Sequence, residues 1–198
     1  MRSIILYAIF NMKNEISVVH NTIGYLKHTK IPRNYRLNIT SYGDAFHVNL
    51  RNKNKIAANM EVYVMRNNNN RIAAEYEGAT HPNYRGRGLG TLIRAVLTKA
   101  LLESGVNYIQ HPFGMNINNI VAKSIATKKG ISINEARKTK NFIPLSTQIV
   151  RKLGYKPDGT GNKATPNMNF TKINKIIRNV PAAINIQRAY RRHLARLR

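Results

Sequence analysis

The sequence contains no cysteine and no tryptophan, and only 8 of its 198 residues are acidic. Without cysteine there is no disulfide framework, no thiolate nucleophile and no thiolate metal site, so nothing indicates an oxidising compartment. No apolar run is long enough to span a membrane, and the opening MRSIILYAIF lacks a small-residue cleavage site. We therefore expect an intracellular protein that is not secreted and holds no metal, cytoplasmic or nuclear, or packaged in a virion.

The scarcity of carboxylates leaves a large excess of positive charge. Lys and Arg number 33, which gives a formal net charge of +25. Such an excess indicates polyanionic partners: nucleic acid, a membrane surface or a phosphorylated ligand. The abundance of Asn, Ile and Lys, including the run NNNN at 67–70, is typical of an AT-rich coding source such as a large DNA virus or a protist.

The length favours one α/β domain with a tail. The opening ten residues read as a strand. Residues 15–25 predict an amphipathic helix, since Ile16, Val19, Ile23 and Leu26 recur at spacings of three and four. From Ala45 onward, three β-like runs separated by Asn-rich turns predict an antiparallel meander. The runs are AFHVNL, IAANMEVYVM and RIAAEYEGAT.

The second half of the domain shows helical patterns and short strands. Residues 91–104 predict a helix with one apolar face, which Gly105 ends. VNYIQH then predicts a strand. Helical patterns follow around residues 118–129, 134–140 and 145–153, and residues 154–173 read as a strand, a loop and a closing strand. The fold class is therefore α/β, with a mixed, mainly antiparallel sheet flanked by helices.

The stretch HPNYRGRGLGT, residues 81–91, joins a strand to a helix through three glycines. Consecutive amides at the positive end of a helix dipole, free of Cβ atoms, form a cradle for an anion. A P-loop would place a lysine before Thr91, and none is present. A dinucleotide fold would place a parallel unit before the glycines and an acidic residue about 20 residues later, and neither is found.

This stretch resembles the central motif of the GNAT acyltransferase superfamily. The family pattern Arg/Gln-x-x-Gly-x-Gly/Ala is met by Arg85, Gly88 and Gly90, and the preceding THPNY is also typical. IVRKLGYKP, residues 149–157, is similar to the family's last helix running into its sixth strand. The resemblance covers roughly residues 45–157. It implies a GNAT-like domain over residues 1–171, with an insertion at about 112–144.

The resemblance also implies a coenzyme A site. Amides of the turn would bind the pyrophosphate of acetyl-coenzyme A, backbone of the fourth strand would pair with the pantetheine arm, and an Asn beyond the fifth strand would contact that arm. The implied cofactor residues are Ala79, Thr80, His81, Arg85, Gly86, Arg87, Gly88, Leu89, Gly90 and Thr91, with Asn116, Asn118 and Asn119 as alternatives for the Asn.

Direct transfer to an amine needs a base and a proton donor to the leaving thiolate. Glu61, Glu75 and Glu77 fall in two neighbouring strands, and Glu75 and Glu77 share one face because side chains alternate along a strand. These glutamates are the candidate bases. The alternative is that they are solvent-exposed carboxylates paired with nearby Lys or Arg and take no part in catalysis. His81 and His111 are lesser candidates.

The usual proton donor of the family is absent. A Tyr commonly precedes the glycine of the last helix by four residues, whereas this chain has Val150 there, or Ala126 if the motif is placed on residues 119–130. Tyr155, Tyr108 or solvent would have to serve instead. The fold could therefore bind the cofactor without efficient turnover.

The last residues, 172–198, carry eight Lys and Arg and no carboxylate. Pro181 is typical of a helix start. The stretch 186–196 resembles an IQ motif, a helix bound by calmodulin or related EF-hand proteins. Nucleic-acid or membrane-surface binding by the same helix remains an alternative. The candidate partner-binding residues are Ile186, Gln187, Tyr190, Arg191, Arg192 and Arg196.

These patterns together predict an acetyl-coenzyme A-dependent N-acetyltransferase acting on a primary amine of a small molecule or protein. The alternative is a non-catalytic basic protein, associated with nucleic acid in a virion or chromosome, on an inactive scaffold of the same fold.

Overall fold

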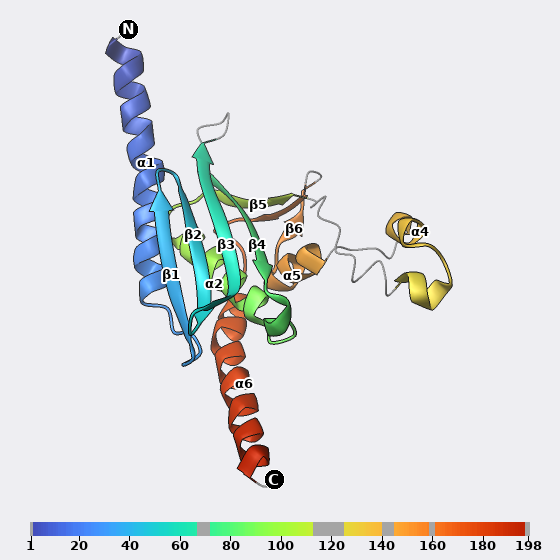
Figure 1. Cartoon of the computed structure of the whole chain (residues 1–198). Helices are drawn as coiled ribbons and strands as arrows, with labels where there is room; N and C mark the ends of the chain where they lie inside the picture. The colour runs from blue at the N-terminus through green and yellow to red at the C-terminus, as the bar shows by residue number, and fades with distance from the viewer. Residues whose placement is uncertain (1, 67–71, 113–124, 140–144, 159–160, 197–198) are drawn as a thin grey trace.

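A computed structural model describes residues 2–66, 72–112, 125–139, 145–158 and 161–196. The described residues form one seven-stranded sheet in the order β1-β2-β3-β4-β5-β7-β6, with helices packed against it (Figure 1). The fold is mixed α/β, with a mainly antiparallel sheet, as the sequence predicts. Only the β4–β5 pair is parallel among the pairs described.

The chain begins with a long helix, α1 (Arg2–Lys27), so the strand expected over the first ten residues is wrong. A short apolar run alone does not distinguish a strand from a helix. No glycine or proline interrupts the chain before Gly24, so the helical pattern of residues 15–25 continues back through the opening run. Val18, Val19 and Leu26 are buried.

The predicted meander is confirmed, with one additional strand before it. β1 (Tyr35–Tyr42) pairs with β2 (Ala45–Asn52), which pairs with β3 (Lys55–Arg66), which pairs with β4 (Ile72–Thr80). A two-residue turn joins β1 to β2, and Gly43 in it has a φ of +61°, which glycine adopts without strain. β1 is not among the strands predicted from the sequence.

The helix after the glycine turn is also confirmed. α2 (Leu89–Glu103) ends at Ser104 and Gly105, and β5 (Tyr108–Pro112) follows it. Residues 125–129 are helical, followed by α4 (Ile133–Lys138), which lies apart from the sheet in Figure 1. α5 (Leu145–Leu153) then leads into β6 (Lys156–Pro157) and β7 (Gly161–Ala164).

The last helix, α6 (Thr171–Arg196), is longer than expected. Pro181 lies inside it, so the prediction that Pro181 begins a helix is wrong. Asn169 caps the first turn by accepting from the Thr171 amide at 2.8 Å, and Ile173 is fully buried, so α6 starts within the domain. Packing of the first turns therefore outweighs the cost of an interior proline.

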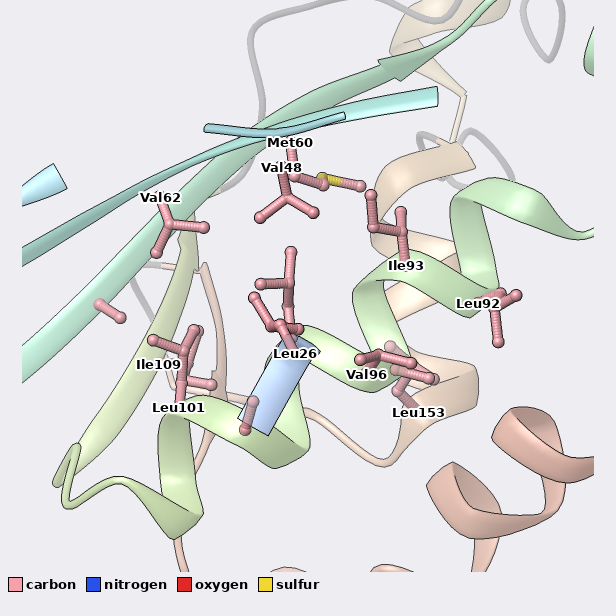
Figure 2. Packing of buried hydrophobic residues seen from close by; sticks show 14 of the residues in the cluster. Leu26, Val48, Met60, Val62, Leu92, Ile93, Val96, Leu101, Ile109 and Leu153 are labelled. Atoms are coloured by element: carbon pink, nitrogen blue, oxygen red, sulfur yellow. The ribbon is translucent and has the colours of Figure 1, made fainter. Parts of the chain in front are cut away.

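The core lies between one face of the sheet and the helices α1 and α2. Val48, Met60 and Val62 of the sheet point toward Leu26 of α1 and Ile93 of α2 (Figure 2). Because side chains alternate along a strand, residues between these positions lie on the opposite face. Tyr42, Tyr63 and Met65 on that face are exposed. We call this side of β1 to β4 the open face.

Candidate functional site

The glycine turn connects β4 to α2 through a short 3-10 helix, η1 (Pro82–Tyr84). His81 caps η1, its Nδ1 accepting from the Asn83 amide at 3.3 Å. Gly86 and Gly88 then adopt φ values of +74° and +73°, which glycine accommodates best. Gly88 is the N-cap of α2 and supplies no side-chain hydrogen bond to it. The first amides of α2 therefore lie at a helix N-terminus with no side-chain cap.

The space around the glycines differs from one to the next. A Cβ at Gly86 would meet nothing within 4 Å, whereas at Gly90 it would lie 2.8 Å from Thr80 Oγ1. At Gly88 it would lie 3.2 Å from Cγ1 of Val180, on α6. Gly86 thus faces open space, Gly90 permits a close approach to β4, and Gly88 packs against α6.

The two arginines of the turn are held by backbone carbonyls. Arg85 Nε donates to the Thr80 carbonyl at 3.2 Å, and an Arg87 terminal nitrogen donates to the Asn83 carbonyl at 3.0 Å. The Arg87 guanidinium also lies 5.2 Å from the centre of the Tyr84 ring. Both cations therefore stay beside the turn, where they favour an anionic ligand.

β4 extends beyond its pairing with β5. The parallel register runs from Ala73 opposite Tyr108 to Glu75 opposite Gln110, whereas β4 continues to Thr80 with β3 on its other side. Within the described register, Ala79 and Thr80 therefore pair with β3 alone. This end of β4 lies next to the glycine turn, and the Thr80 carbonyl there accepts from Arg85 Nε. Ala79, Thr80 and His81 are the residues that the resemblance assigns to the pantetheine arm.

The three candidate glutamates share the open face of the sheet. Glu61 of β3 is paired with Glu77 of β4, and Tyr63 is paired with Glu75, and directly paired residues lie on the same side. The register therefore brings Glu61, Glu75 and Glu77 together, as the sequence predicts. The side chains of Glu75 and Glu77 lie outside the described part of the chain.

Glu61 is part of a hydrogen-bonded group that is not predicted from the sequence. Tyr42 Oη donates to Glu61 Oε1 at 2.7 Å, and His47 Nε2 lies 2.6 Å from the same oxygen and 2.7 Å from Tyr42 Oη. We call Tyr42, His47 and Glu61 the open-face triad. The alternation of β2 could have placed His47 beside Glu61, but Tyr42 required recognition of β1.

These contacts change the acid–base properties of the triad. Hydrogen bonds from Tyr42, Tyr63 and His47, in that order of effect, lower the pKa of Glu61 to about 2. The bond to Glu61 also raises the pKa of Tyr42 to about 12. A carboxylate with so low a pKa is a poor proton acceptor at neutral pH. Glu61 is therefore better suited to attract a cation than to act as a base.

The candidate proton donors, Tyr155 and Tyr108, and Val150 lie in different surroundings. α5 leads directly into β6, and Val150, where the resemblance would call for a Tyr, is fully buried. The Tyr155 hydroxyl is buried and lies 2.9 Å from Thr98 Oγ1, so it cannot reach a ligand at the turn. Tyr108 is half-buried on β5, with Lys163 Nζ 4.0 Å from its ring centre.

Several other candidates are structural or lie outside the described residues. His111 is buried, and burial together with the nearby Arg94 charge lowers its pKa to about 4, so it is neutral at physiological pH. Asn116, Asn118 and Asn119 fall outside the described ranges. So do the side chains of the tail candidates Ile186, Gln187, Tyr190, Arg191, Arg192 and Arg196, although residues up to Arg196 are helical.

A surface pocket of about 670 Å³ lies elsewhere, between α1, the end of α2 and α6, lined by residues such as Tyr25, Lys30 and Glu103. Glu103 is at the opposite end of α2 from the glycine turn, so this pocket is separate from the candidate site. Among the residues described, no group of three His, Cys, Asp or Glu is placed to hold a metal ion. No helix in the same part of the chain is long and apolar enough to cross a membrane.

Comparison with known proteins identifies the C-terminal motif. Residues 180–198 match the model of the IQ calmodulin-binding motif. No curated protein matches the chain.

Two solved structures are distantly similar. A protein of unknown function from Aquifex aeolicus is 14% identical, with a TM-score of 0.35, over 79% of this chain and 86% of that one. A cAMP-binding acyltransferase from Mycobacterium smegmatis is 16% identical, with a TM-score of 0.36, over 73% of this chain and 41% of that one. Similarity at this level carries no argument about activity.

Proposed function

We propose that this protein is an acetyl-coenzyme A-dependent N-acetyltransferase of GNAT-like fold. The observation that carries the proposal is the uncapped glycine turn at the start of α2, directly beside the part of β4 that extends beyond its pairing with β5. The turn suits a pyrophosphate and the extended backbone suits a linear arm, so the end of β4 and the start of α2 together offer both parts of a coenzyme A site.

The residues of the site fit this cofactor. Gly86 leaves open space above the turn, Gly90 allows backbone to approach closely, and Arg85 and Arg87 add positive charge. Amides from Leu89 to Thr91 would hold the pyrophosphate, and Ala79 to His81 the arm. Bound acetyl-coenzyme A would supply an activated thioester to an amine.

The open face of the sheet is the proposed acceptor side. The strand register puts Glu61, Glu75 and Glu77 at positions of this face in a chain of net charge +25, so the face is the proposed site of attraction for a protonated amine. Because Glu61 has a pKa of about 2, we assign the role of base to Glu75 or Glu77, and cation attraction to Glu61.

Cofactor binding can be tested at Gly86, where a side chain meets no neighbour within 4 Å. Asn and Asp tolerate a positive φ better than other residues, so Gly86→Asn and Gly86→Asp form a pair that differs in charge alone. We expect Gly86→Asp to bind acetyl-coenzyme A about tenfold more weakly than Gly86→Asn in calorimetry, because its carboxylate repels the pyrophosphate. Equal affinities would contradict the assignment, and a wild-type chain that binds no coenzyme A would remove it. Gly88 is unsuitable for this test because it contacts Val180.

Turnover can be tested at the two remaining glutamates. With acetyl-coenzyme A and a panel of amines, basic peptides and aminoglycosides, the enzyme should release free thiol in an acceptor-dependent manner. We expect Glu75→Gln or Glu77→Gln, whichever removes the base, to lower kcat by about 10²-fold or more. Glu61→Gln is the matched control on the same face, and we expect a larger effect on KM than on kcat.

The outcome of this assay also separates the enzyme from its alternative. Cofactor binding without acceptor-dependent thiol release would favour a non-catalytic basic protein that binds nucleic acid. A double Gln variant with unchanged kcat would exclude both glutamates as the base.

We also propose that the C-terminal part of α6 binds a calmodulin-like EF-hand protein. The match of residues 180–198 to the IQ motif supports this binding. The five arginines and absent carboxylates of this segment complement the acidic lobes of such proteins. Replacing Ile186 with Asp should abolish calmodulin binding while leaving nucleic-acid affinity nearly unchanged.

A further inference from the structure

Helix α6 both packs beside the glycine turn and carries the segment that matches the IQ motif. Its first turns pack within the domain, where Ile173 is fully buried and Lys99 Nζ donates to Asn174 Oδ1 at 3.1 Å. Further along, a Cγ of Val180 lies 3.2 Å from where a Cβ of Gly88 would be, so Val180 covers the N-cap glycine of α2. The same helix carries the IQ motif match, which begins at residue 180.

The packed part of α6 and the IQ segment overlap. Ile184 is partly buried against the core, so packing continues beyond Val180 into the matched residues. Ile186 follows two residues later, only about 3 Å further along the helix axis. A folded lobe that closes around the helix at Ile186 would need the space that the domain occupies beside Ile184 and Val180.

We infer that binding of a calmodulin-like protein to α6 competes with packing of α6 on the glycine turn, so that this partner lowers the affinity of the chain for acetyl-coenzyme A. The inference rests on the proposed cofactor site and names its regulation. By linkage, acetyl-coenzyme A lowers the affinity for the partner by the same factor.

Two physical effects explain why the partner should lower the affinity for acetyl-coenzyme A rather than raise it. Release of Val180 removes the side chain that packs on Gly88, whose φ of +73° sets the start of α2. An acidic partner bound to α6 also lowers the positive potential around the turn, where Arg85 and Arg87 lie. Both effects weaken anion binding at the turn.

Pro181 makes one turn of α6 weaker than the rest of the helix. A proline has no amide hydrogen to donate to the carbonyl four residues earlier, which is that of Ile177. Between Ile177 and Pro181 the helix therefore already lacks one backbone hydrogen bond. Release of the IQ segment need not unfold the turns that bury Ile173.

The competition can be measured without any cofactor. Val180→Ala weakens packing on Gly88, and the exposed neighbour Asn179→Ala serves as the matched control on the same helix. If calmodulin must first displace α6, Val180→Ala should bind it about fivefold more tightly than wild type, measured by anisotropy of labelled calmodulin with and without Ca²⁺. The control should change little. Unchanged or weaker binding by Val180→Ala, or no calmodulin binding by wild type, would overturn the inference.

The coupling to the cofactor is measured on the same full-length proteins. Saturating acetyl-coenzyme A should lower calmodulin affinity about fivefold in wild type and less in Val180→Ala, and saturating calmodulin should lower acetyl-coenzyme A affinity equally. A wild-type chain that binds both independently overturns the inference and leaves the proposed function intact. A chain that binds no acetyl-coenzyme A removes the proposed function, while the Val180 comparison still decides whether calmodulin displaces α6.

Discussion

At the scale of single residues, the neighbours of Glu61 decide what its carboxylate can do. The sequence places it beside Glu75 and Glu77 as an equivalent candidate base. In the structure its carboxylate accepts a hydrogen bond from Tyr42 and lies 2.6 Å from His47 Nε2. These contacts, the bond from Tyr42 foremost, lower the pKa of Glu61 to about 2. Hydrogen bonds to the charged form stabilise it, so Glu61 is a poor base even though it shares a face with Glu75 and Glu77.

The lowered pKa of Glu61 predicts a pH dependence of stability. A carboxyl whose pKa falls from about 4.5 to about 2 on folding stabilises the folded state above about pH 4.5 and loses this contribution as pH falls toward 2. We expect the difference in unfolding free energy between wild type and Glu61→Gln to shrink over that range, as measured by urea denaturation. Curves that stay parallel down to pH 2 would contradict the prediction.

Replacing the hydrogen-bond donor Tyr42 tests the main cause of the lowered pKa of Glu61. Tyr42→Phe keeps the ring and removes the hydroxyl that donates to Glu61, so the pKa of Glu61 should rise toward its ordinary value. Carbon-13 NMR of the carboxyl group would measure that change directly.

At the scale of elements, a helix, strand or turn is predictable from the sequence when its signal is local. The glycine turn and α2 were predicted because each requires a backbone conformation or a period readable within about 15 residues. The opening helix reads as a strand from its sequence because the isolated apolar run has no decisive period. β1 was missed although Tyr35, Leu37 and Ile39 alternate toward the buried side, since the polar residues between them resembled a loop.

Contacts between distant elements could not be predicted. The open-face triad depends on the register of three strands, and one of them, β1, was not recognised. The packing of Val180 on Gly88 joins residues far apart in the sequence and depends on α6 extending through Pro181, which local rules read as a helix start. The glycine turn is therefore predictable from the sequence, whereas the helix that packs on it is not.

At the scale of the whole molecule, the net charge of +25 belongs mostly to the domain rather than to the IQ segment. Residues 180–198 carry five arginines and no carboxylate, so the rest of the chain keeps a formal charge of +20, which is 25 minus 5. Binding to nucleic acid driven by such charge should depend on salt and should not require one segment.

This distribution predicts the salt dependence of any binding to DNA. Replacing Arg188, Arg191 and Arg192 with Gln removes three charges from the tail, and Lys128, Lys129 and Lys138, all exposed, offer a matched triple replacement elsewhere. Each neutralised phosphate contributes about 0.9 to the slope of log affinity against log salt, so either triple variant should reduce that slope by at most about 2.7. If charge acts collectively, the two variants should show similar reductions in titrations of a DNA duplex at several salt concentrations. A loss confined to the tail variant would instead make α6 the nucleic-acid site, and DNA would then compete with calmodulin for the same helix.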